Sequence, residues 1–485
     1  MKKSQYILLI ILALNILLRI PGLFDPVSYG DECIYLTLGQ GFNKGLVFYR
    51  DIHDNKPPLL YLVAALSGGT QFWFRLITIV WNSINVYIIY LLAKKLLKKE
   101  TVGLVAAALF AYFSLLPEGR VANAEIFFIM PATLGVLTAF KALEKKKVFY
   151  WFLSGLLFAL AFLFKIPVAF DYVGLVLAFF VFSYLNKAVE KKSFNPIFKI
   201  LTDKNFYLNL AGFIIPIIFS IGYYAIKGAF TPYVRSALMQ NIGYLSSWGG
   251  DNSGLYIRAA ILLFISFIIF ILRKKLKFPF VVFSLLGFWS LYGVYLSERP
   301  YPHYYMEIVP WAAMLLTIFI FQRKVFQLLI ILLFLATIRI GYVKYNFWWY
   351  HHLPYYKNFS QFALGKINKD EYFKFFGDKV TNDYKVAKYL KINTDDKDNV
   401  FIWGDGVCIY SLSRKLPPGR YTVNYHIFDF NGFEETLKAI EDKQPKFIIK
   451  LTSEHRKFPQ LDDLLIKGYK RVEKIGEAII YKKIN

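Results

Sequence analysis

The composition of this 485-residue chain excludes an ordinary water-soluble protein, because 56% of its residues are apolar, 19% are aromatic and only 19% are charged. Its formal charge of +25 does not indicate nucleic-acid binding, since the basic residues form short clusters between apolar runs. The two cysteines, Cys33 and Cys408, exclude a disulfide framework and a cysteine-based metal site, and we interpret them as two unrelated thiols.

Eleven apolar runs predict membrane-spanning helices, since a bilayer core requires roughly 20 mostly apolar residues per helix. They lie near residues 6–24, 72–93, 102–117, 125–140, 148–164, 167–186, 207–226, 255–272, 279–297, 305–321 and 325–343. The first run lacks a small-x-small cleavage site, so we interpret it as a retained anchor and not as a cleaved signal peptide. The two runs beside Pro167 are either two helices or one broken helix.

Basic clusters at alternate ends of these runs predict the orientation, because cytoplasmic loops carry the excess of Lys and Arg. The clusters lie at Lys2-Lys3, 94–99, 141–147, 187–204, 273–277 and Arg323-Lys324. They place the N-terminus in the cytoplasm, and an odd number of spans then places the C-terminal segment outside. We therefore expect a multi-pass protein of the plasma membrane.

The remaining segments predict the domain organisation. Residues 1–343 are expected to form a transmembrane domain with an outer catalytic loop at 25–58. Residues 344–485 are expected to form an extracytoplasmic α/β domain, because helical patterns alternate there with short apolar strands. The helical patterns lie at 383–390 and 433–442, and the strands at 399–404, 446–451 and 478–483. The predicted fold class is therefore a polytopic α-helical membrane protein with a C-terminal α/β domain.

The first polar group in the outer segments is Tyr29-Gly30-Asp31-Glu32. Two adjacent carboxylates at a membrane surface repel each other and are costly to desolvate, so one of them often has a raised pKa and suits a general base. Asp31 is equally well placed to cap a helix beginning near Cys33. The local residues leave both interpretations open.

The second polar group is the segment from His53 to Leu59, at the entry to the second span. Pro57 and Pro58 fix the backbone where a loop becomes a helix. Lys56 is then held at the interface, where its ammonium can meet a lipid phosphate. A snorkelling lysine without a ligand is the alternative.

Two further groups stand at the outer ends of later spans. Arg120 is expected to pair with Glu125, and Arg299 and His303 can both donate hydrogen bonds to phosphate oxygens. Lys165 adds a cation near the same face. A charge within the bilayer costs a few kcal/mol and is a functional candidate by default, although snorkelling at a helix end also explains Lys165.

These motifs resemble, in their order along the chain, the C-type membrane glycosyltransferases of the dolichyl-phosphate-mannose–protein mannosyltransferase and aminoarabinose-transferase superfamily (glycosyltransferase family 39-like). The matching residues are Asp31-Glu32-Cys33-Ile34-Tyr35, Lys56 to Leu59, Glu125, Lys165-Ile166-Pro167, and His303-Tyr304 with Pro310. The resemblance covers roughly residues 1–320, and a soluble tail is typical of prokaryotic members. One departure is Ile166, where many relatives have glycine.

The resemblance implies a C-type glycosyltransferase fold and transfer of a sugar from a dolichyl or undecaprenyl phosphate carrier to an acceptor at the outer membrane face. The implied reaction is a single inverting displacement. Asp31 corresponds to the candidate base of the family, and Lys56 to a contact of the carrier phosphate. We add Glu32, the neighbour of Asp31, as a second catalytic candidate. We group the other candidates with these: Arg299, His303 and Lys165 as phosphate-binding residues, and Tyr35, His53, Arg120, Glu125 and Tyr304 as substrate-binding residues.

We expect no metal or other cofactor. The implied reaction needs no nucleotide, and the absence of a phosphate-cradling glycine-rich loop is consistent with a lipid-bound donor. Asp31, Glu32 and Glu125 could nevertheless share a divalent cation. The expected partners are a polyprenyl-phosphate-linked sugar, membrane lipids and an acceptor that is a lipid, a glycan or a protein. The alternatives are an enzyme that joins lipid-linked oligosaccharides and a transporter or flippase, which would place its polar groups near the bilayer midplane. A receptor would leave the loop carboxylates unexplained.

Overall fold

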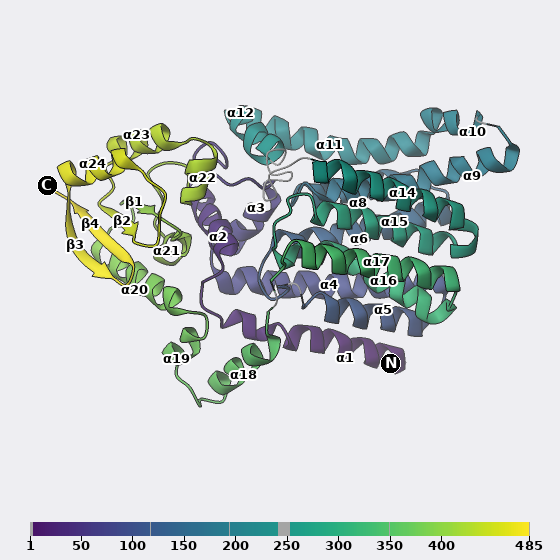
Figure 1. Cartoon of the computed structure of the whole chain (residues 1–485), viewed down its shortest axis with the longest axis horizontal. Coiled ribbons are helices and arrows are strands. Elements are labelled where there is room, and N and C mark those ends of the chain that lie inside the picture. Colours follow the sequence, from purple (N-terminus) through teal and green to yellow (C-terminus); the bar gives the residue numbers. More distant parts are fainter. Residues whose placement is uncertain (1–2, 117, 194, 241–252, 349, 485) are drawn as a thin grey trace. The chain divides into compact units, whose positions relative to one another are not determined.

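The structure is a computed structural model that describes residues 3–484, except residues 117, 194, 241–252 and 349. It contains two compact units (Figure 1). The first comprises Met1–Ile20, Thr78–Tyr223 and Leu238–Trp349, and the second comprises Pro21–Ile77, Tyr224–Ala237 and Tyr350–Asn485. The predicted domain boundary after residue 343 stays a prediction. In the structure, the loop at residues 25–58 clusters with the C-terminal segment.

The described residues of the first unit form helices joined by short turns. The helices are α1 (Lys3–Leu17), α4 (Gln71–Leu97, from Thr78 onward), α5 (Glu100–Phe113), α6 (Ala124–Lys145), α7 (Phe149–Phe162), α8 (Val168–Val176), η2 (Leu177–Val181), α9 (Phe182–Lys191), α10 (Asn195–Phe198), η3 (Lys199–Thr202), α11 (Lys204–Ile226, up to Tyr223), α14 (Ser253–Leu276), α15 (Phe278–Val294), η5 (Pro302–Ile308), α16 (Val309–Gln322) and α17 (Val325–Lys344). Among the described residues, eight helices are long and apolar enough to cross a membrane. The other three predicted runs form the shorter apolar helices α5, α7 and α15.

The segment around Pro167 forms two helices and not one broken helix. The ring of Phe158 lies 5.7 Å from that of Tyr172, whereas the ring of Trp151, nearer the start of α7, lies 4.8 Å from that of Phe180. Because later residues of the second helix contact earlier residues of the first, α7 and the helix that begins with α8 run antiparallel. They therefore correspond to two separate predicted runs.

Glycines allow α7 and α11 to pack closely. A Cβ atom at Gly155 would come within 1.9 Å of the Asn209 carbonyl oxygen, and one at Gly212 within 2.1 Å of the Phe152 carbonyl oxygen. In a lipid environment, helices associate through close van der Waals packing, which small residues permit. These two positions therefore fix how near the two backbones lie.

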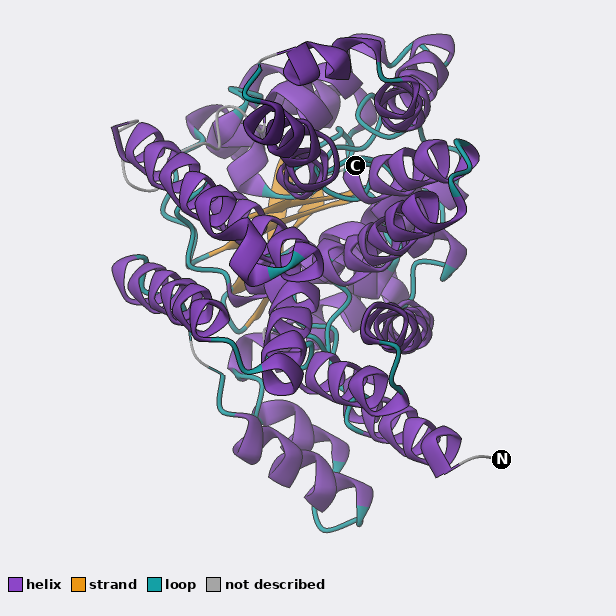
Figure 2. Ribbon diagram, turned by 90° about the vertical axis from the view of Figure 1, so that its right-hand side faces the viewer, coloured by secondary structure: helices purple, strands orange, loops and turns teal. Residues whose placement is uncertain are grey.

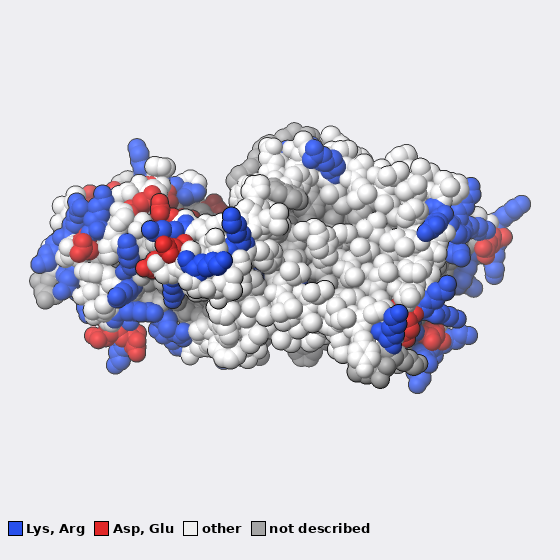
Figure 3. Space-filling view, turned by 90° about the horizontal axis from the view of Figure 1, so that it is seen from below, with Lys and Arg blue, Asp and Glu red and all other residues white. Residues whose placement is uncertain are grey.

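The predicted basic clusters gather at one end of the first unit (Figure 3). Lys95 forms an ion pair with Glu144, and the guanidinium of Arg273 donates a hydrogen bond to Asn186. The end of α4 therefore contacts that of α6, and the end of α14 contacts α9. Since Glu125 begins α6 and Glu144 lies in its last turn, Glu125 stands at the opposite end.

The second unit combines helices with one small sheet, which Figure 2 shows in orange. Its helices are η1 (Ile20–Leu23, from Pro21), α2 (Gly30–Asn43), α3 (Leu59–Leu66), α12 (Phe230–Tyr233), η4 (Val234–Met239, up to Ala237), α18 (His352–Ala363), α19 (Lys369–Lys374), α20 (Asp378–Asn393), α21 (Val407–Ser413), α22 (Asn424–Asp429), α23 (Phe433–Lys443) and α24 (Pro459–Gly468). The strands are β1 (Val400–Trp403), β2 (Phe447–Leu451), β3 (Tyr469–Ile475) and β4 (Ala478–Lys483). The three predicted strands and both predicted helices of this segment are present.

The sheet has the strand order β1-β2-β4-β3, with β1 and β2 parallel and the other pairs antiparallel. Successive residues of a strand face opposite sides of a sheet, so a strand covered on both sides is apolar throughout. β1 is buried at every position because residues 400 and 402 pack in one core with α20 and α21, whereas residues 401 and 403 pack in a second core with α23 and α24.

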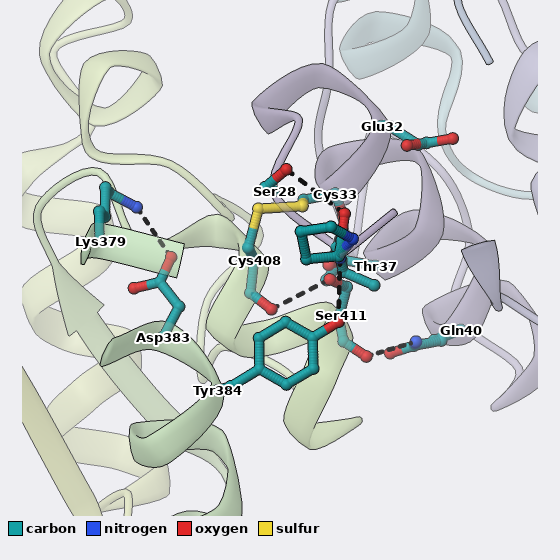
Figure 4. Close-up of a disulfide and its surroundings, with 12 residues drawn as sticks. Ser28, Glu32, Cys33, Thr37, Gln40, Lys379, Asp383, Tyr384, Cys408 and Ser411 are labelled. Carbon is teal, nitrogen blue, oxygen red and sulfur yellow. Dashed lines mark hydrogen bonds and ion pairs between the residues drawn. A yellow bond between two sulfur atoms is a disulfide. The ribbon is translucent and has the colours of Figure 1, made fainter. Parts of the chain in front are cut away.

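The two cysteines form a disulfide within the second unit, so their interpretation as unrelated thiols is wrong. Cys33 on α2 and Cys408 on α21 are bonded, with their Cα atoms 4.9 Å apart (Figure 4). The side-chain amide of Gln40 donates a hydrogen bond of 2.9 Å to the Ser411 carbonyl oxygen and joins the same two helices. The partners are separated by 375 positions, so only the fold brings them together.

Candidate active site

One candidate site in the second unit centres on Lys56. Its ammonium lies 3.8 Å from Oδ2 of Asp31 and 3.7 Å from Oδ2 of Asp54, and 5.0 Å from the ring centroid of Tyr35. We call Asp31, Tyr35, Asp54 and Lys56 the Lys56 group. The side chain of Asp31 is 32% exposed and that of Lys56 18%, whereas that of Asp54 is 2% exposed. The group therefore offers one accessible carboxylate and one accessible cation side by side.

Two buried tyrosines hold the backbone at Lys56. The hydroxyl of Tyr49 donates a 2.8 Å hydrogen bond to the Lys56 carbonyl oxygen. The hydroxyl of Tyr61 accepts a 2.9 Å bond from the Lys56 N–H and donates a 2.8 Å bond to Oδ2 of Asp54. Burial raises the pKa of both tyrosines well above the usual value, so both hydroxyls stay protonated. Together with Pro57 and Pro58, which follow it, these hydrogen bonds fix the backbone from which the Lys56 side chain extends.

Asp31 lies in the first turn of α2 and not at its cap. The helix begins at Gly30, and Tyr29 occupies the N-cap position. A carboxylate in the first turn is stabilised by the helix dipole. Oδ2 of Asp31 also accepts a 3.1 Å hydrogen bond from the hydroxyl of Tyr35, one turn further along the helix. Asp31 is thus held beside Lys56 within the helix and is not its N-cap residue, and its role as a general base stays a prediction.

Glu32 occupies a different environment from Asp31. Its carboxylate accepts hydrogen bonds from Nη2 of Arg75 at 2.6 Å and from Nε at 2.9 Å, and its side chain is 1% exposed. Arg75 also lies 3.3 Å from Asp25. A bidentate, buried pair of this kind fixes geometry and commits the carboxylate to its partner. Arg75 was not among the predicted residues, although an arginine inside an apolar run is the signal that identifies it.

His53, predicted to bind substrate, is fully buried in the second unit. Its Nδ1 lies 3.2 Å from Oγ of Ser236, and its ring packs against those of Tyr421 and His426. Burial, followed by the nearby charges of His426 and Arg420, lowers the pKa of His53 well below its usual value. A neutral imidazole in this position supports the loop, and its assignment to substrate stays a prediction.

A second candidate site, in the first unit, joins residues from three parts of the sequence. Lys165 forms an ion pair with Glu125 and lies 3.9 Å from the ring centroid of Tyr304. Nδ1 of His303 lies 2.7 Å from Oε2 of Glu118, and its Nε2 lies 3.9 Å from Oε1 of Glu125. We call these five residues the Glu125 group. Glu118 was not predicted, and the sequence alone places it only in a loop after α5.

Helix ends position the Glu125 group. Glu125 stands in the first turn of α6, where a carboxylate suits the helix dipole. Lys165 lies in the turn between α7 and α8, which Pro167 completes, and His303 lies in η5, before α16. The structure therefore brings together four of the predicted residues, Glu125, Lys165, His303 and Tyr304.

A cavity of about 300 Å³ adjoins the Glu125 group. Its polar lining includes Lys165, Tyr292, Ser297, Tyr304 and Glu307. The apolar lining is Ile166, Pro167, Phe170, Leu238, Leu255, Val294 and Leu296. Ile166, which stands where many relatives have glycine, therefore lines the cavity, and its neighbour Lys165 lines it as well. The cavity therefore combines mostly apolar walls with one ammonium and one carboxylate, a lining typical of small-molecule sites.

Arg120 and Arg299 are both half-buried in the first unit. The N–H of Arg299 donates a 3.5 Å hydrogen bond to Oγ of Ser297. Glu125, the predicted partner of Arg120, is engaged by Lys165, so the roles of both arginines stay predictions. Sequence reasoning missed a buried carboxylate on α8, Asp171, which accepts a 2.8 Å hydrogen bond from the Trp311 indole.

Among the residues that the structure describes, no group of three or more His, Cys, Asp or Glu side chains could hold a metal ion. Of the three carboxylates considered for a shared cation, Glu32 is committed to Arg75 and Glu125 to Lys165. Independence from metals stays a prediction.

Comparison with known proteins adds two similarities. Residues 56–198 match the family model described as dolichyl-phosphate-mannose-protein mannosyltransferase. No curated protein sequence matches the chain. The crystal structure of ArnT from Cupriavidus metallidurans bound to undecaprenyl phosphate is similar, with a TM-score of 0.60 and 10% identity, over 100% of this chain and 99% of that one. The apo structure of ArnT covers the same shares at 10% identity, with a TM-score of 0.44.

The family model begins at Lys56 and includes Glu125 and Lys165, so it covers residues of both candidate sites. The similarity to the bound ArnT structure extends over the whole chain and establishes the fold. The chain is therefore a multi-pass membrane protein with the fold of ArnT, and its predicted resemblance to the mannosyltransferase and aminoarabinose-transferase superfamily is confirmed.

Proposed function

We propose that this chain is a membrane glycosyltransferase that moves a sugar from a polyprenyl-phosphate carrier to an acceptor hydroxyl. The observation that carries the proposal is the Lys56 group, in which an accessible carboxylate and an accessible ammonium lie 3.8 Å apart. The mannosyltransferase family match and the fold support the same reaction class. The solved structure with this fold is described as bound to undecaprenyl phosphate, which supports a polyprenyl carrier here.

The Lys56 group supplies what a single displacement requires. The carboxylate of Asp31 accepts the proton of the acceptor hydroxyl, and the acceptor oxygen forms a bond to the anomeric carbon of the sugar. The bond from that carbon to the carrier phosphate breaks, and the electron pair leaves with the polyprenyl phosphate. Lys56 stabilises the negative charge that grows on this phosphate. Asp31 thus supplies general-base catalysis, and Lys56 supplies electrostatic catalysis. Attack opposite the leaving group inverts the anomeric centre.

The cavity of the first unit, considered by itself, suits an isoprenoid chain. Its walls are mostly apolar, and Lys165, which lies 3.9 Å from the ring centroid of Tyr304, lines it together with Glu307. An isoprenoid chain needs apolar walls, and a phosphate needs a cation. The ion pair of Lys165 with Glu125 compensates the ammonium charge until an anion takes its place.

We infer that the second unit lies on the extracytoplasmic side and the N-terminus in the cytoplasm. The basic ends of the first unit gather at one end, as the excess of Lys and Arg on the cytoplasmic side requires. The Cys33–Cys408 disulfide supports an oxidising location for the second unit, because cytosolic thiols are kept reduced. No observation favours a transporter or an oligosaccharide-joining enzyme.

The test is sugar transfer by the purified full-length protein in lipid nanodiscs, supplied with an extract of polyprenyl-phosphate sugars and cellular acceptors. Mass spectrometry should find a product heavier than the acceptor by one sugar residue. Asp31→Asn keeps the side-chain shape but cannot accept the proton, so the rate should fall about 100-fold or more with an unchanged melting temperature.

The matched control is Asp51→Asn, in the same loop. Asp51 pairs with the exposed Arg50 and accepts a hydrogen bond from the Val47 N–H, and neither partner belongs to the Lys56 group. Its variant should transfer sugar at the wild-type rate. A wild-type protein that transfers no sugar from any supplied donor would refute the proposal. A wild-type rate in Asp31→Asn would remove Asp31 as the base.

A further inference from the structure

The C-terminal segment reaches the Lys56 group through His426. This residue lies on α22, is 1% exposed, and places its Nε2 3.7 Å from Oδ1 of Asp54. The same Asp54 presents its other oxygen, Oδ2, to Lys56 at 3.7 Å. Asp54 therefore lies between an imidazole from the C-terminal segment and the ammonium of the candidate site.

Further contacts hold these two parts of the chain together. The backbone N–H of His53 donates a 2.8 Å hydrogen bond to the Arg420 carbonyl oxygen, and His53 forms a parallel β-bridge with Tyr421. The rings of His53 and His426 are 5.1 Å apart and perpendicular. The backbone just before Asp54 is thus attached to the segment at Arg420 and Tyr421, a few residues before His426, and the His53 ring also contacts the His426 ring.

Burial makes Asp54 dependent on its partners. Its side chain is 2% exposed, and an ionised carboxylate removed from water requires hydrogen-bond donors or positive charge around it. The Tyr61 hydroxyl and Lys56 serve Oδ2, and His426 faces Oδ1. If the partner at Oδ1 is lost, the carboxylate has reason to rotate or shift, and Lys56 loses one of the two carboxylates that hold it.

We propose that His426 is a positioning residue of the reaction centre, through which the C-terminal segment completes the Lys56 group. His426 holds Asp54, and Asp54 holds the Lys56 ammonium close to Asp31, where it can meet the carrier phosphate. This inference rests on the proposed function. His426 touches neither the carrier nor the acceptor, and it acts on the rate through the placement of Lys56.

Two substitutions separate the two ring nitrogens of His426. The amide nitrogen of Gln takes a position like that of Nε2, which faces Asp54, whereas the amide nitrogen of Asn takes a position like that of Nδ1. His426→Asn and His426→Ala should each lower kcat about tenfold, the effect of one lost polar partner of a buried charge. His426→Gln should retain most of the rate. A change that merely disturbed packing would not distinguish Gln from Asn in this way.

A double-mutant cycle tests whether His426 acts through Asp54. Asp54→Asn removes the charge that His426 holds, so adding His426→Ala to Asp54→Asn should change kcat by less than about twofold, because residues that act through one contact are not additive. His455→Asn, an exposed histidine of the same segment, is the control and should keep the wild-type rate. Melting temperatures of all variants identify any that fail to fold. If His426→Ala or His426→Asn fails to fold, the rate of His426→Gln is compared with that of the remaining variant and the wild type.

The experiment measures kcat and KM for the lipid donor and, separately, the affinity of each variant for undecaprenyl phosphate alone. Loss of kcat in the Asn and Ala variants, without additivity to Asp54→Asn, supports the inference. Wild-type rates in both variants, or losses that multiply with Asp54→Asn, overturn it and leave the proposed function intact. If the wild type transfers no sugar, the proposed function fails. The affinity of the variants for undecaprenyl phosphate then tests the positioning role of His426. Non-additive weakening of undecaprenyl phosphate binding still supports His426 as a positioning residue, and unchanged binding overturns it.

Discussion

Asp31 and Glu32 are neighbours in the sequence but point to different partners. Successive side chains of an α-helix are rotated by about 100°, so a pair at the start of α2 cannot both face Lys56. The side chain of Asp31 remains 32% exposed beside Lys56, whereas that of Glu32 is 1% exposed against Arg75. One carboxylate is therefore available for chemistry, and the other ties α2 to the start of α4.

Removing the charge of Glu32 should therefore affect stability more than it affects proton transfer. Glu32→Gln leaves the buried guanidinium of Arg75 with Asp25 as its remaining acidic partner, and breaking a buried pair from one side costs about 3–5 kcal/mol. We expect a lower melting temperature for the purified variant, measured by thermal unfolding in detergent. Asp31→Asn is the matched comparison, with a melting temperature close to the wild type. Equal melting temperatures for the two variants would contradict the structural role of Glu32.

At the scale of elements, the packing of α7 against α11 makes a second stability prediction. Gly155→Ala places a methyl group within 1.9 Å of the Asn209 carbonyl oxygen, which is backbone and cannot rotate away. The two helices must separate, and overpacking of this kind costs about 1–3 kcal/mol. Thermal unfolding should show a lower melting temperature for this variant.

Gly222 offers the control, because it lies on α11, the helix against which Gly155 packs, and a Cβ atom there would meet nothing within 4 Å. Gly222→Ala should leave the melting temperature unchanged or raise it slightly, since alanine favours a helix more than glycine does. A loss of stability in Gly222→Ala equal to that in Gly155→Ala would point to a general effect of the substitution and not to the crossing.

The sequence predicts those helices and strands whose surroundings, lipid or a protein core, require apolar residues. A helix in lipid must satisfy its own backbone and present apolar side chains, so each of the eleven runs coincides with a described helix. β1, β2 and β4 are short apolar runs, and all three are predicted. β3 is not, because only its first residue, Tyr469, is buried and the rest of this edge strand is mostly exposed and charged. Its strand conformation depends on pairing with β4.

The sequence predicts several residues of the candidate sites, but it does not predict which distant residues contact each other there. Lys56 and Asp31 follow from local sequence, since each stands where a loop becomes a helix. The link from Asp54 to His426 and that from Glu118 to His303 join residues far apart in the chain. Such contacts depend on the tertiary arrangement of each unit, which residue spacing does not encode. The Cys33–Cys408 bond is missed for the same reason.

The orientation of the whole molecule makes a labelling prediction. Lys99→Cys introduces a thiol at the basic end of the first unit, and Lys474→Cys introduces one on an exposed position of β3. The native cysteines are bonded and do not compete for the reagent. A membrane-impermeant maleimide added to intact cells should modify residue 474 and reach residue 99 only after permeabilisation. Labelling of residue 99 alone in intact cells would invert the proposed topology.

The bond between Cys33 and Cys408 also constrains the order of biosynthesis. Cys33 leaves the ribosome 375 positions before its partner, so every membrane helix must be synthesised before the thiol finds Cys408. Until then α2, which carries Asp31, lacks this attachment. A ribosome that stops before residue 408 would therefore release a chain with its membrane helices made and the attachment of α2 unfinished. Synthesis as far as Cys408 thus acts as a checkpoint for the segment that bears the carboxylate.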